Sequence, residues 1–386
     1  MRKNFDIIYG NPRQCLFAMV LPMMAAMFLN MAYNLVDSLW IGNLLGESAY
    51  AALTAATPIL LLLNSIAMGA TNGVAILLSQ AIGAGETRRT RTILFTSFIL
   101  SIVFSLGMTG LLEGMVSPLL RFLQVPSELY EMTCLYLRIY LIGYGAVYLY
   151  CYFAAVLRSF GDTVFQMLAM LVCTVLNGAL DPLLIHGFGL QGAAAATVLS
   201  QGICLGFMVC YLRKKALFSF HAADWSGKEL GTICLKSLPA AFQQSIPAIS
   251  TSVLTAIVSG FGVTALAAYG VAGKLELLLF YPAMSFQMVL TTIVGQCIGA
   301  GRRDRAWVYC KTALLWGGGL LIILSCGVVG LAHPLSELFV DSKAVAEVVA
   351  GYFQVVSVGY LFNMETNCFL GAVNGMGHPG RSMLCM

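Results

Sequence analysis

Long apolar runs, each long enough to form a membrane helix, alternate along this chain with short polar turns rich in glycine and arginine. About twenty consecutive apolar residues carry an α-helix across the hydrocarbon core of a bilayer. Such runs form helices because a backbone in lipid must satisfy its own hydrogen bonds. The pattern predicts an all-α integral membrane protein with ten transmembrane helices, at residues 15–40, 51–82, 92–117, 130–157, 164–186, 191–213, 232–258, 267–298, 307–332 and 344–373.

Parts of the sequence occur twice at a constant spacing. The stretch from Gln80 to Gly85 returns 216 positions later as the stretch from Gln296 to Gly301. Each repeat unit contains six spans, so the two units have the same orientation, related by an axis along the membrane normal. We expect an N-lobe of six helices at residues 1–213, a cytoplasmic linker at 214–231, and a C-lobe at 232–386. A duplicated membrane bundle is the usual architecture of a secondary transporter.

The repeat also predicts that part of the second unit is missing. At this spacing residue 386 corresponds to residue 170, so the C-lobe has four full helices and only the start of a fifth. The second unit contains no counterparts of residues 171–216. We therefore expect two parallel six-helix repeats in a twelve-helix plan of which ten helices are present. A genuine ten-helix protein is the alternative.

The composition supports a membrane protein and excludes several other classes. The chain is 59% hydrophobic and 10% charged, whereas soluble domains carry about 25% charged residues. The net charge of +4 is small, so we expect no nucleic-acid partner. The twelve cysteines are scattered and form no metal-binding spacing. The lipid bilayer itself is the expected environment, and we expect a monomer.

The positions of the basic residues predict the orientation of the chain. With the amino terminus inside, the outer segments hold only Arg121 and Lys343 of the 21 lysines and arginines. Arg138 and Lys274 fall within spans, and the others fall in inner segments. Because cytoplasmic loops of membrane proteins carry the excess of Lys and Arg, this asymmetry places the amino terminus in the cytoplasm. We expect a multi-pass protein of the cell inner (plasma) membrane.

Asp37 is an ionisable residue near the outer end of the first span. A charged side chain at the bilayer centre costs on the order of 2.5–3.5 kcal/mol on insertion scales, so such residues usually have a function. Asn34 precedes Asp37 by three residues and is expected on the same helix face.

Asp181 is the equivalent feature of the fifth span. Asn177 lies four residues earlier, on the same face of the helix. Pro182 has no N–H to donate, so the carbonyl oxygen of Gly178 is free to act as a ligand. Thr197 in the sixth span offers a hydroxyl at similar depth.

These side chains present hard oxygen donors, which suit a proton or an alkali cation and are poor ligands for zinc. The sequence predicts a cation-binding site at Asp37, Asn177, Asp181, Thr197 and Asn34. Na⁺ at Asp37, Asn177 and Asp181 is the one metal ion we consider. The alternative is that the two aspartates merely end their helices at the wet outer interface.

The remaining sequence features limit the energy source and the chemistry. The turn at Gly83-Ala84-Gly85-Glu86 lacks the Lys-Ser/Thr of a phosphate-binding loop, and it follows a helix rather than a strand. We interpret it as a helix C-cap. No nucleotide-binding domain is apparent, so the driving force is expected to be a gradient of H⁺, Na⁺ or substrate, with no cofactor. No catalytic cluster is apparent, so we expect no enzyme.

Six stretches together resemble one transporter family. They are Asn34-Leu-Val-Asp37-Ser-Leu-Trp-Ile-Gly42, Gln80-Ala-Ile-Gly-Ala-Gly85, Leu157-Arg-Ser-Phe-Gly-Asp-Thr163, Asn177-Gly-Ala-Leu-Asp181-Pro182, Gly192-Ala-Ala-Ala-Ala-Thr197 and Gln296-Cys-Ile-Gly-Ala-Gly301. On these stretches the chain resembles a multidrug and toxic compound extrusion (MATE) transporter. The resemblance implies two six-helix lobes that rock between outward- and inward-facing states. It also implies export of amphipathic, often cationic small molecules by H⁺ or Na⁺ antiport.

The resemblance also suggests where the substrate binds. It carries the family's amino-lobe cation site to Asp37, Asn177, Asp181 and Thr197. Some members also use acids on spans 7 and 10, where this chain has amides and one acid. Residues of the substrate cavity are therefore expected among Gln243, Gln244, Asn363, Glu365 and the intramembrane Arg138.

Two alternative functions stay open from the sequence. A lipid-linked saccharide flippase of related architecture would need a cationic cavity, for which only Arg138 and Lys274 are available. A non-functional, truncated transporter is the other alternative. The sequence specifies neither the substrate, nor H⁺ against Na⁺, nor the more stable of the two facing states.

Overall fold

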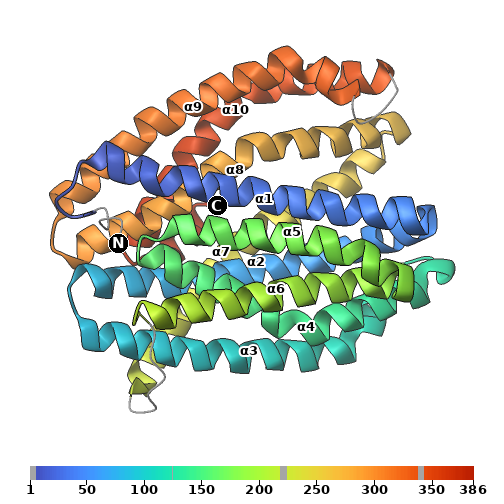
Figure 1. Ribbon diagram of the computed structural model, residues 1–386. Coiled ribbons are helices and arrows are strands. Elements are labelled where there is room, and N and C mark those ends of the chain that lie inside the picture. Colours follow the sequence, from blue (N-terminus) through green and yellow to red (C-terminus); the bar gives the residue numbers. More distant parts are fainter. Residues whose placement is uncertain (1–5, 124, 218–223, 338–342) are drawn as a thin grey trace.

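A computed structural model describes residues 6–123, 125–217, 224–337 and 343–386. Within these ranges the regular structure is helical, and Figure 1 shows long helices running side by side. The helices are α1 (Pro12–Leu45), α2 (Glu47–Gly83), α3 (Thr87–Phe122), α4 (Ser127–Ser159), α5 (Thr163–Phe188), α6 (Leu190–Lys214), α7 (Gly227–Ser259), α8 (Val263–Gly299), α9 (Arg303–Glu337), α10 (Lys343–Gly375) and α11 (Pro379–Leu384).

Each of the ten predicted spans falls within one of the helices α1 to α10, which confirms the all-α membrane class. Among the described residues, eight helices are long and apolar enough to cross a membrane. α10 adds a ninth as a bent pair, Val345–Ser357 and Phe362–Gly375, with an angle of 54° between them. α7 is not among them because glutamines, serines and threonines, including Gln243 and Gln244, interrupt its apolar run.

Apolar cores hold two groups of helices together. Side chains of the helices α1 to α6 share one core, in which Tyr144 of α4 and Ile41 of α1 are fully buried. Side chains of α8, α9 and α10 share another, around Phe286 and Phe353, and the first turns of α1 pack into it at Leu16. The predicted division at the linker stays a prediction, and residues 218–223 of that linker lie outside the described ranges.

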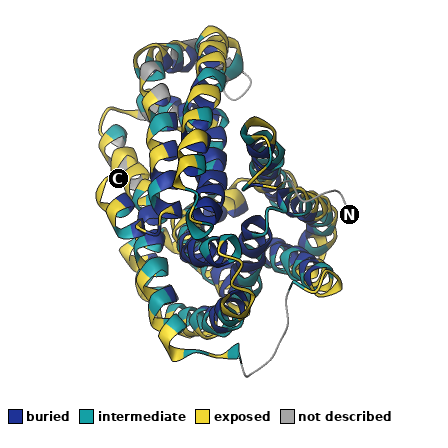
Figure 2. Ribbon diagram, turned by 90° about the vertical axis from the view of Figure 1, so that its left-hand side faces the viewer, coloured by how far each residue is buried: buried dark blue, intermediate teal, exposed yellow. Residues whose placement is uncertain are grey.

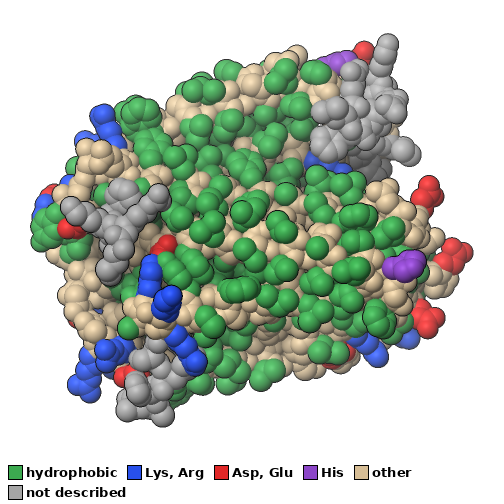
Figure 3. All heavy atoms as spheres, in the orientation of Figure 1, with side chains coloured by type: hydrophobic (Ala, Val, Ile, Leu, Met, Phe, Trp, Pro, Cys, Tyr) green, Lys and Arg blue, Asp and Glu red, His purple; other side chains and the backbone are tan. Residues whose placement is uncertain are grey.

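One end of the bundle carries most of the basic residues, and we call it the basic end. Figure 3 shows Lys and Arg gathered there, acidic side chains mainly at the opposite end, and an apolar surface between. The predicted C-cap after α2 is confirmed at this end, since Gly85 follows the helix with φ of 70°. Its counterpart in the repeat, Gly301, follows α8 with φ of 72°. The basic end is defined by Arg88, Arg89, Arg91, Lys214, Lys215, Arg302, Arg303 and Arg305.

Asp162, in the turn between α4 and α5, ties this turn to the end of α6. Its carboxylate caps α5 by accepting from the backbone N–H of Phe165 at 3.1 Å. It also accepts from the Tyr211 hydroxyl at 2.6 Å and from Lys215 Nζ at 2.8 Å. Burial raises the pKa of Asp162, but the hydrogen bonds from Lys215 and Tyr211 outweigh it and hold the pKa below its ordinary value.

We expect the Asp162→Asn variant to be less stable than the parent at neutral pH by about 1 kcal/mol, the scale of a charge-assisted hydrogen bond partly exposed to water. Because the folded-state pKa of Asp162 is depressed, its contribution is fully present above the unfolded pKa of about 3.9. It declines below that pH and is lost as the pH falls through the lower folded-state pKa. Thermal unfolding in detergent at a series of pH values measures the difference between the two proteins.

The control for this prediction is Asp304→Asn, because Asp304 pairs with Arg302 at 3.0 Å on the surface and its side chain is 68% exposed. We expect no measurable change in that variant, since exposed pairs are screened by water. A stability difference for Asp162→Asn that persists unchanged below pH ~3.9 would contradict the assignment.

Candidate functional site

Helices α1 and α5 approach closely in the half of the bundle away from the basic end. A methyl group at Gly178 of α5 would lie 3.3 Å from Cγ1 of Val36 on α1, so the glycine permits the approach. The Thr174 hydroxyl of α5 donates to the carbonyl of Leu29 on α1 at 3.3 Å. These contacts bring the next helix turns, which carry Asp37 and Asp181, against one another.

The predicted pair on α5 is formed as the four-residue spacing requires. Asn177 Nδ2 donates to Asp181 Oδ1 at 3.1 Å. Both side chains are completely buried, with 0% exposure. The amide thereby holds one carboxylate oxygen and leaves the other to face its neighbours.

Asp37 lies beside this pair from α1. It is 8% exposed, and its charge acts on Asp181 across the gap between the helices. Thr197 of α6 is also buried, and its side chain interacts with Tyr33, which lies one helix turn before Asp37 on α1. The structure therefore brings together four of the five residues predicted for the cation site, from α1, α5 and α6.

Three oxygen atoms of this cluster have no partner. Among the described residues, Asp37 Oδ1, Asn177 Oδ1 and Asp181 Oδ2 are buried and accept no hydrogen bond. A buried polar atom without a partner is costly, and a buried charge is more so unless it is paired. These two carboxylate oxygens and one amide oxygen form a buried acceptor set that a proton or a small cation can satisfy.

Tyr33 and Ser200 complete the cluster, and the sequence analysis missed them. Tyr33 lies four residues before Asp37, and its hydroxyl oxygen is 3.4 Å from Oγ of Ser200. Ser200 in turn donates to the carbonyl of Thr197 at 3.0 Å. The signal was available, because Tyr33 and Ser200 stand one helix turn from Asp37 and Thr197.

A second tyrosine, Tyr136 of α4, lies within electrostatic reach of both aspartates. It is buried, and the charges of both Asp37 and Asp181 act on it. Nothing in the local sequence pairs it with either aspartate, since it lies on a helix that sequence spacing does not relate to α1 or α5.

Asn34 does not join the cluster. Its side chain is exposed, and its Nδ2 donates to the carbonyl of Asn30 at 2.7 Å, one turn back on the same helix. A spacing of three residues leaves two side chains about 60° apart around an α-helix. Asp37 therefore points into the bundle while Asn34 points away from the buried site.

The residues predicted for a substrate cavity lie on α7 and α10. Gln243 is buried, and its Oε1 accepts from Asn374 Nδ2 at 3.2 Å. Asn363 accepts from Asn367 Nδ2 through its Oδ1 at 2.6 Å. Gln244 and Glu365 are half-buried. A shared cavity for these residues stays a prediction.

Arg138 is placed elsewhere. Its side chain is 51% exposed and lies 3.9 Å from the carboxylate of Glu113 on α3. The described contacts thus put it on the α3–α4 surface, with an acid that the sequence analysis overlooked, rather than beside Gln243 or Asn363.

The helices α8 and α10 share a carboxylate of their own. Glu276 Oε1 accepts from the hydroxyls of Tyr352 and Tyr360, each at 2.5 Å. Tyr352 lies in the first segment of α10, which ends at Ser357. Tyr360 lies in the bend before the second segment begins at Phe362. Glu276 of α8 therefore contacts the first segment and the bend of α10. Both tyrosine hydroxyls have an acceptor here, so this cluster holds α8 and α10 together.

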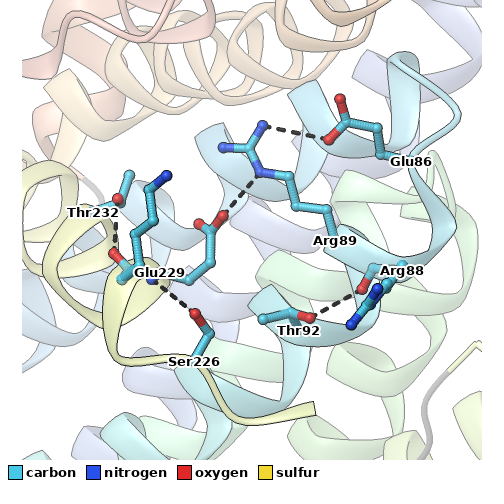
Figure 4. Close-up of polar contacts among 8 residues, drawn as sticks. Glu86, Arg88, Arg89, Thr92, Ser226, Glu229 and Thr232 are labelled. Atoms are coloured by element: carbon cyan, nitrogen blue, oxygen red, sulfur yellow. Dashed lines mark hydrogen bonds and ion pairs between the residues drawn. The ribbon is translucent and has the colours of Figure 1, made fainter.

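A hollow of about 650 Å³ lies at the basic end, well separated from the aspartates. Figure 4 shows Arg89 pointing between Glu86 and Glu229, with the Arg89 Nε donating to Glu229 Oε1 at 3.0 Å. The Glu229 N–H donates to Oγ of Ser226 at 3.4 Å, which caps α7. The hollow is lined by both charges and joins the start of α7 to the start of α3.

Comparison with known proteins supports one family. The sequence profile of the MatE family matches residues 22–183 and 239–386. The chain is 29% identical to the "Probable multidrug resistance protein YpnP" of Bacillus subtilis (strain 168), over 78% of this chain and 69% of that protein. It is 28% identical to the "FAD transporter" of Shewanella oneidensis, over 100% of this chain and 87% of that protein.

A solved structure gives the same fold. The protein described as "Crystal structure of MATE in the straight conformation" superposes with a TM-score of 0.92, covering 100% of this chain and 87% of that one at 22% identity. The match extends over the whole chain and so includes the helices that carry the aspartate cluster.

Proposed function

This chain belongs to the MatE family of transporters, and on that premise we propose that it exports amphipathic, cationic organic compounds in exchange for H⁺ or Na⁺. Relatives of the chain are named as multidrug resistance or export proteins and as a FAD transporter, so the chain is a transporter and not an enzyme. We propose three further points: which ion is coupled, what charge the cargo carries, and which residues bind each.

One observation carries the proposal. The partnerless oxygens of Asp37, Asn177 and Asp181 lie in a buried cluster between the helices of the bundle. A stable core would fill such a place with apolar side chains or with donors, because unpaired buried acceptors destabilise it. A site that binds and releases a cation needs such unpaired acceptors, because they are the ligands of the cation.

The exchange of cation for cargo follows from the free-energy cost of burying two charged carboxylates. When the cluster holds a proton or Na⁺, the charge of the two carboxylates is reduced and their burial is tolerated. When the cation leaves, the repelling carboxylates favour a rearranged, wetter cluster. Coupling requires only that one facing state of the protein binds the cation better than the other. The two facing states are thereby linked to the cation gradient.

The rocking units in this proposal are the two lobes, at residues 1–213 and 232–386. In this proposal the membrane is the plasma membrane. The basic end faces the cytoplasm, because Lys and Arg are retained on the inner side. Asp37 and Asp181 then lie toward the outer half of the first lobe, where an inward cation gradient loads them.

Transport by the purified 386-residue protein in liposomes tests the proposal. Ethidium serves as the amphipathic cation, and FAD, the cargo in the name of the Shewanella relative, serves as the comparison substrate. We expect a pH or Na⁺ gradient to drive ethidium movement, and dissipation of that gradient with an ionophore to stop it. Movement of FAD alone, or ethidium movement that ignores both gradients, would reject the proposed cargo or the proposed coupling respectively.

A further inference from the structure

Helices α2 and α8 touch backbone to backbone where they end at the basic end. A Cβ on Gly83 of α2 would lie 2.0 Å from the carbonyl oxygen of Gln296 on α8. A Cβ on Gly299 of α8 would lie 2.0 Å from the carbonyl oxygen of Gln80 on α2. No residue other than glycine fits at either position while the two helices stay in contact, because the obstructing atoms belong to the main chain.

Two glutamine side chains next to these glycines reach across to other helices. Gln80 Nε2 of α2 donates to the carbonyl of Gly375, the last residue of α10, at 2.9 Å. Gln296 Nε2 of α8 donates to the carbonyl of Ser159, the last residue of α4, at 2.7 Å. Each bond therefore joins one of the helices α1–α6 to one of the helices α7–α10.

The two bonds are copies of one another. Gln80 and Gln296 are counterparts in the sequence repeat, 216 positions apart, and their acceptors Ser159 and Gly375 are separated by the same 216 positions. The glycine contacts obey the same relation. The duplicated sequence thus makes the same contact twice, once from each repeat to the other. The two contacts together form part of the interface between the repeats.

The acceptors are oxygens that have no partner within their own helix. The last carbonyls of an α-helix lack an intrahelical donor. After α4, the N–H groups of Gly161 and Asp162 donate to the carbonyls of Arg158 and Leu157, so neither donates to the carbonyl of Ser159. After α10, the N–H groups of residues 377 and 378 donate to the carbonyls of residues 374 and 373, so neither donates to the carbonyl of Gly375.

These bonds are shielded from water, so breaking them has a cost. Ser159 and Gly375 are buried, Gln296 is 7% exposed, and Gln80 is half-buried. If the helices separated at this end, both glutamines would lose their acceptors, and both carbonyls would have to be hydrated. Figure 2 views the bundle from this end and shows buried residues in its middle.

We propose that Gln80 and Gln296 form a paired latch that holds the basic end of the transporter shut, and that each transport cycle opens and remakes both halves together. This rests on the proposed alternation between two facing states. The latch sets how often the basic end opens and makes no contact with the cation cluster, so it is a positioning device rather than part of the binding site.

The rate at which a buried thiol at the seam becomes modified measures opening directly. Ser79 is completely buried and would meet a Cβ placed on Gly295 of α8 at 2.9 Å, so it sits between α2 and α8. In a Ser79→Cys background, a water-soluble thiol reagent reaches this position only when the seam opens. Peptide mass spectrometry separates this label from labels on the twelve native cysteines.

Removing one half of the latch should raise the labelling rate. Gln80→Met and Gln296→Met keep the side-chain length and lose the donor. We expect each to increase the rate of Cys labelling at position 79 by roughly 3- to 10-fold, the weight of one net hydrogen bond, and by similar factors because the two bonds are equivalent. Gln354→Met, an exposed glutamine on α10, is the matched control and should leave the rate unchanged.

A second pair of variants tests the same seam without touching the glutamines. Gly83→Ala and Gly299→Ala place a methyl group where the partner backbone lies, so both should favour the open seam and raise the labelling rate. Gly202→Ala on α6, which has nothing within 4 Å of its added methyl, is the control and should not. Labelling of the buried Cys173 must stay at the parental level, as the check that the fold is intact.

Unchanged labelling at position 79 in Gln80→Met and Gln296→Met would overturn the latch, as would an effect in only one of the two. If either glutamine variant unfolds, the glycine pair decides, and equal labelling in Gly83→Ala, Gly299→Ala and Gly202→Ala rejects the proposal. The readout is opening rather than transport. A protein that fails to export ethidium could still show the latch, and an exporter could lack it.

Discussion

Replacing Asp181 by Asn is expected to abolish gradient-driven export by the reconstituted protein. Asn has the shape of Asp and can still accept the hydrogen bond that Asn177 donates at 3.1 Å, so the cluster should keep its packing. It cannot carry the negative charge or release a proton in the working range of pH. Ethidium transport under a pH or Na⁺ gradient should fall to the level of liposomes without protein.

The matched control for Asp181→Asn is Glu113→Gln. Glu113 is also an acid in a membrane helix, α3, but it lies on the α3–α4 surface beside Arg138. Export by that variant should stay within about twofold of the parent, because the pair is loose, at 3.9 Å, and Arg138 is 51% exposed. Retention of coupled export by Asp181→Asn, or an equal loss in both variants, would show that the coupling lies elsewhere.

Replacing Gly192 by Ala is expected to destabilise the protein by roughly 1–3 kcal/mol or more, the range for forcing extra atoms into a packed interior. A Cβ on Gly192, in the first turn of α6, would lie 2.1 Å from the carbonyl oxygen of Leu184 and 2.4 Å from its carbon. These are main-chain atoms of α5, so relief requires the two helices to move apart. Thermal unfolding in detergent, followed by tryptophan fluorescence, measures the loss.

Gly206→Ala on the same helix separates the packing effect from helix propensity. Nothing lies within 4 Å of a methyl group at that position. Alanine there should stabilise by up to about 1 kcal/mol, because it is the better helix former. If both variants change the melting temperature alike, the contact between Gly192 and Leu184 does not constrain the protein.

The fold was largely predictable because lipid imposes a strong constraint on sequence. Apolar runs, basic turns and the repeat each point to the same helices, and every predicted span lies within a helix. α7 shows the limit of this argument. Its run holds Gln243 and Gln244, and its buried Gln243 meets Asn374, a partner that composition does not reveal.

The cation cluster was predictable where its members share one helix. The spacing of Asn177 and Asp181 gives their hydrogen bond directly. The three-residue spacing of Asn34 and Asp37 misled, because the offset around the helix turns Asn34 away. Tyr136 could not be predicted, since it meets Asp37 and Asp181 only through the packing of α4 against the other helices.

The latch residues were visible in the sequence as a repeat but not as a contact. The stretches from Gln80 and Gln296 suggested helix ends, which the structure confirms. Their bonds to Gly375 and Ser159 span 295 and 137 residues, distances over which local spacing carries no information. Duplication gives the symmetry of such an interface, and only the folded chain gives its partners.

Loading of the aspartate pair with a cation is best measured on the purified protein, without transport. Two readings suffice: proton release into a weakly buffered solution when ethidium is added, and retention of radioactive Na⁺ at equilibrium. The account predicts that the parent protein shows at least one of them, and that the Asp37→Asn, Asp181→Asn double variant shows neither. A double variant that matches the parent in both readings would contradict it.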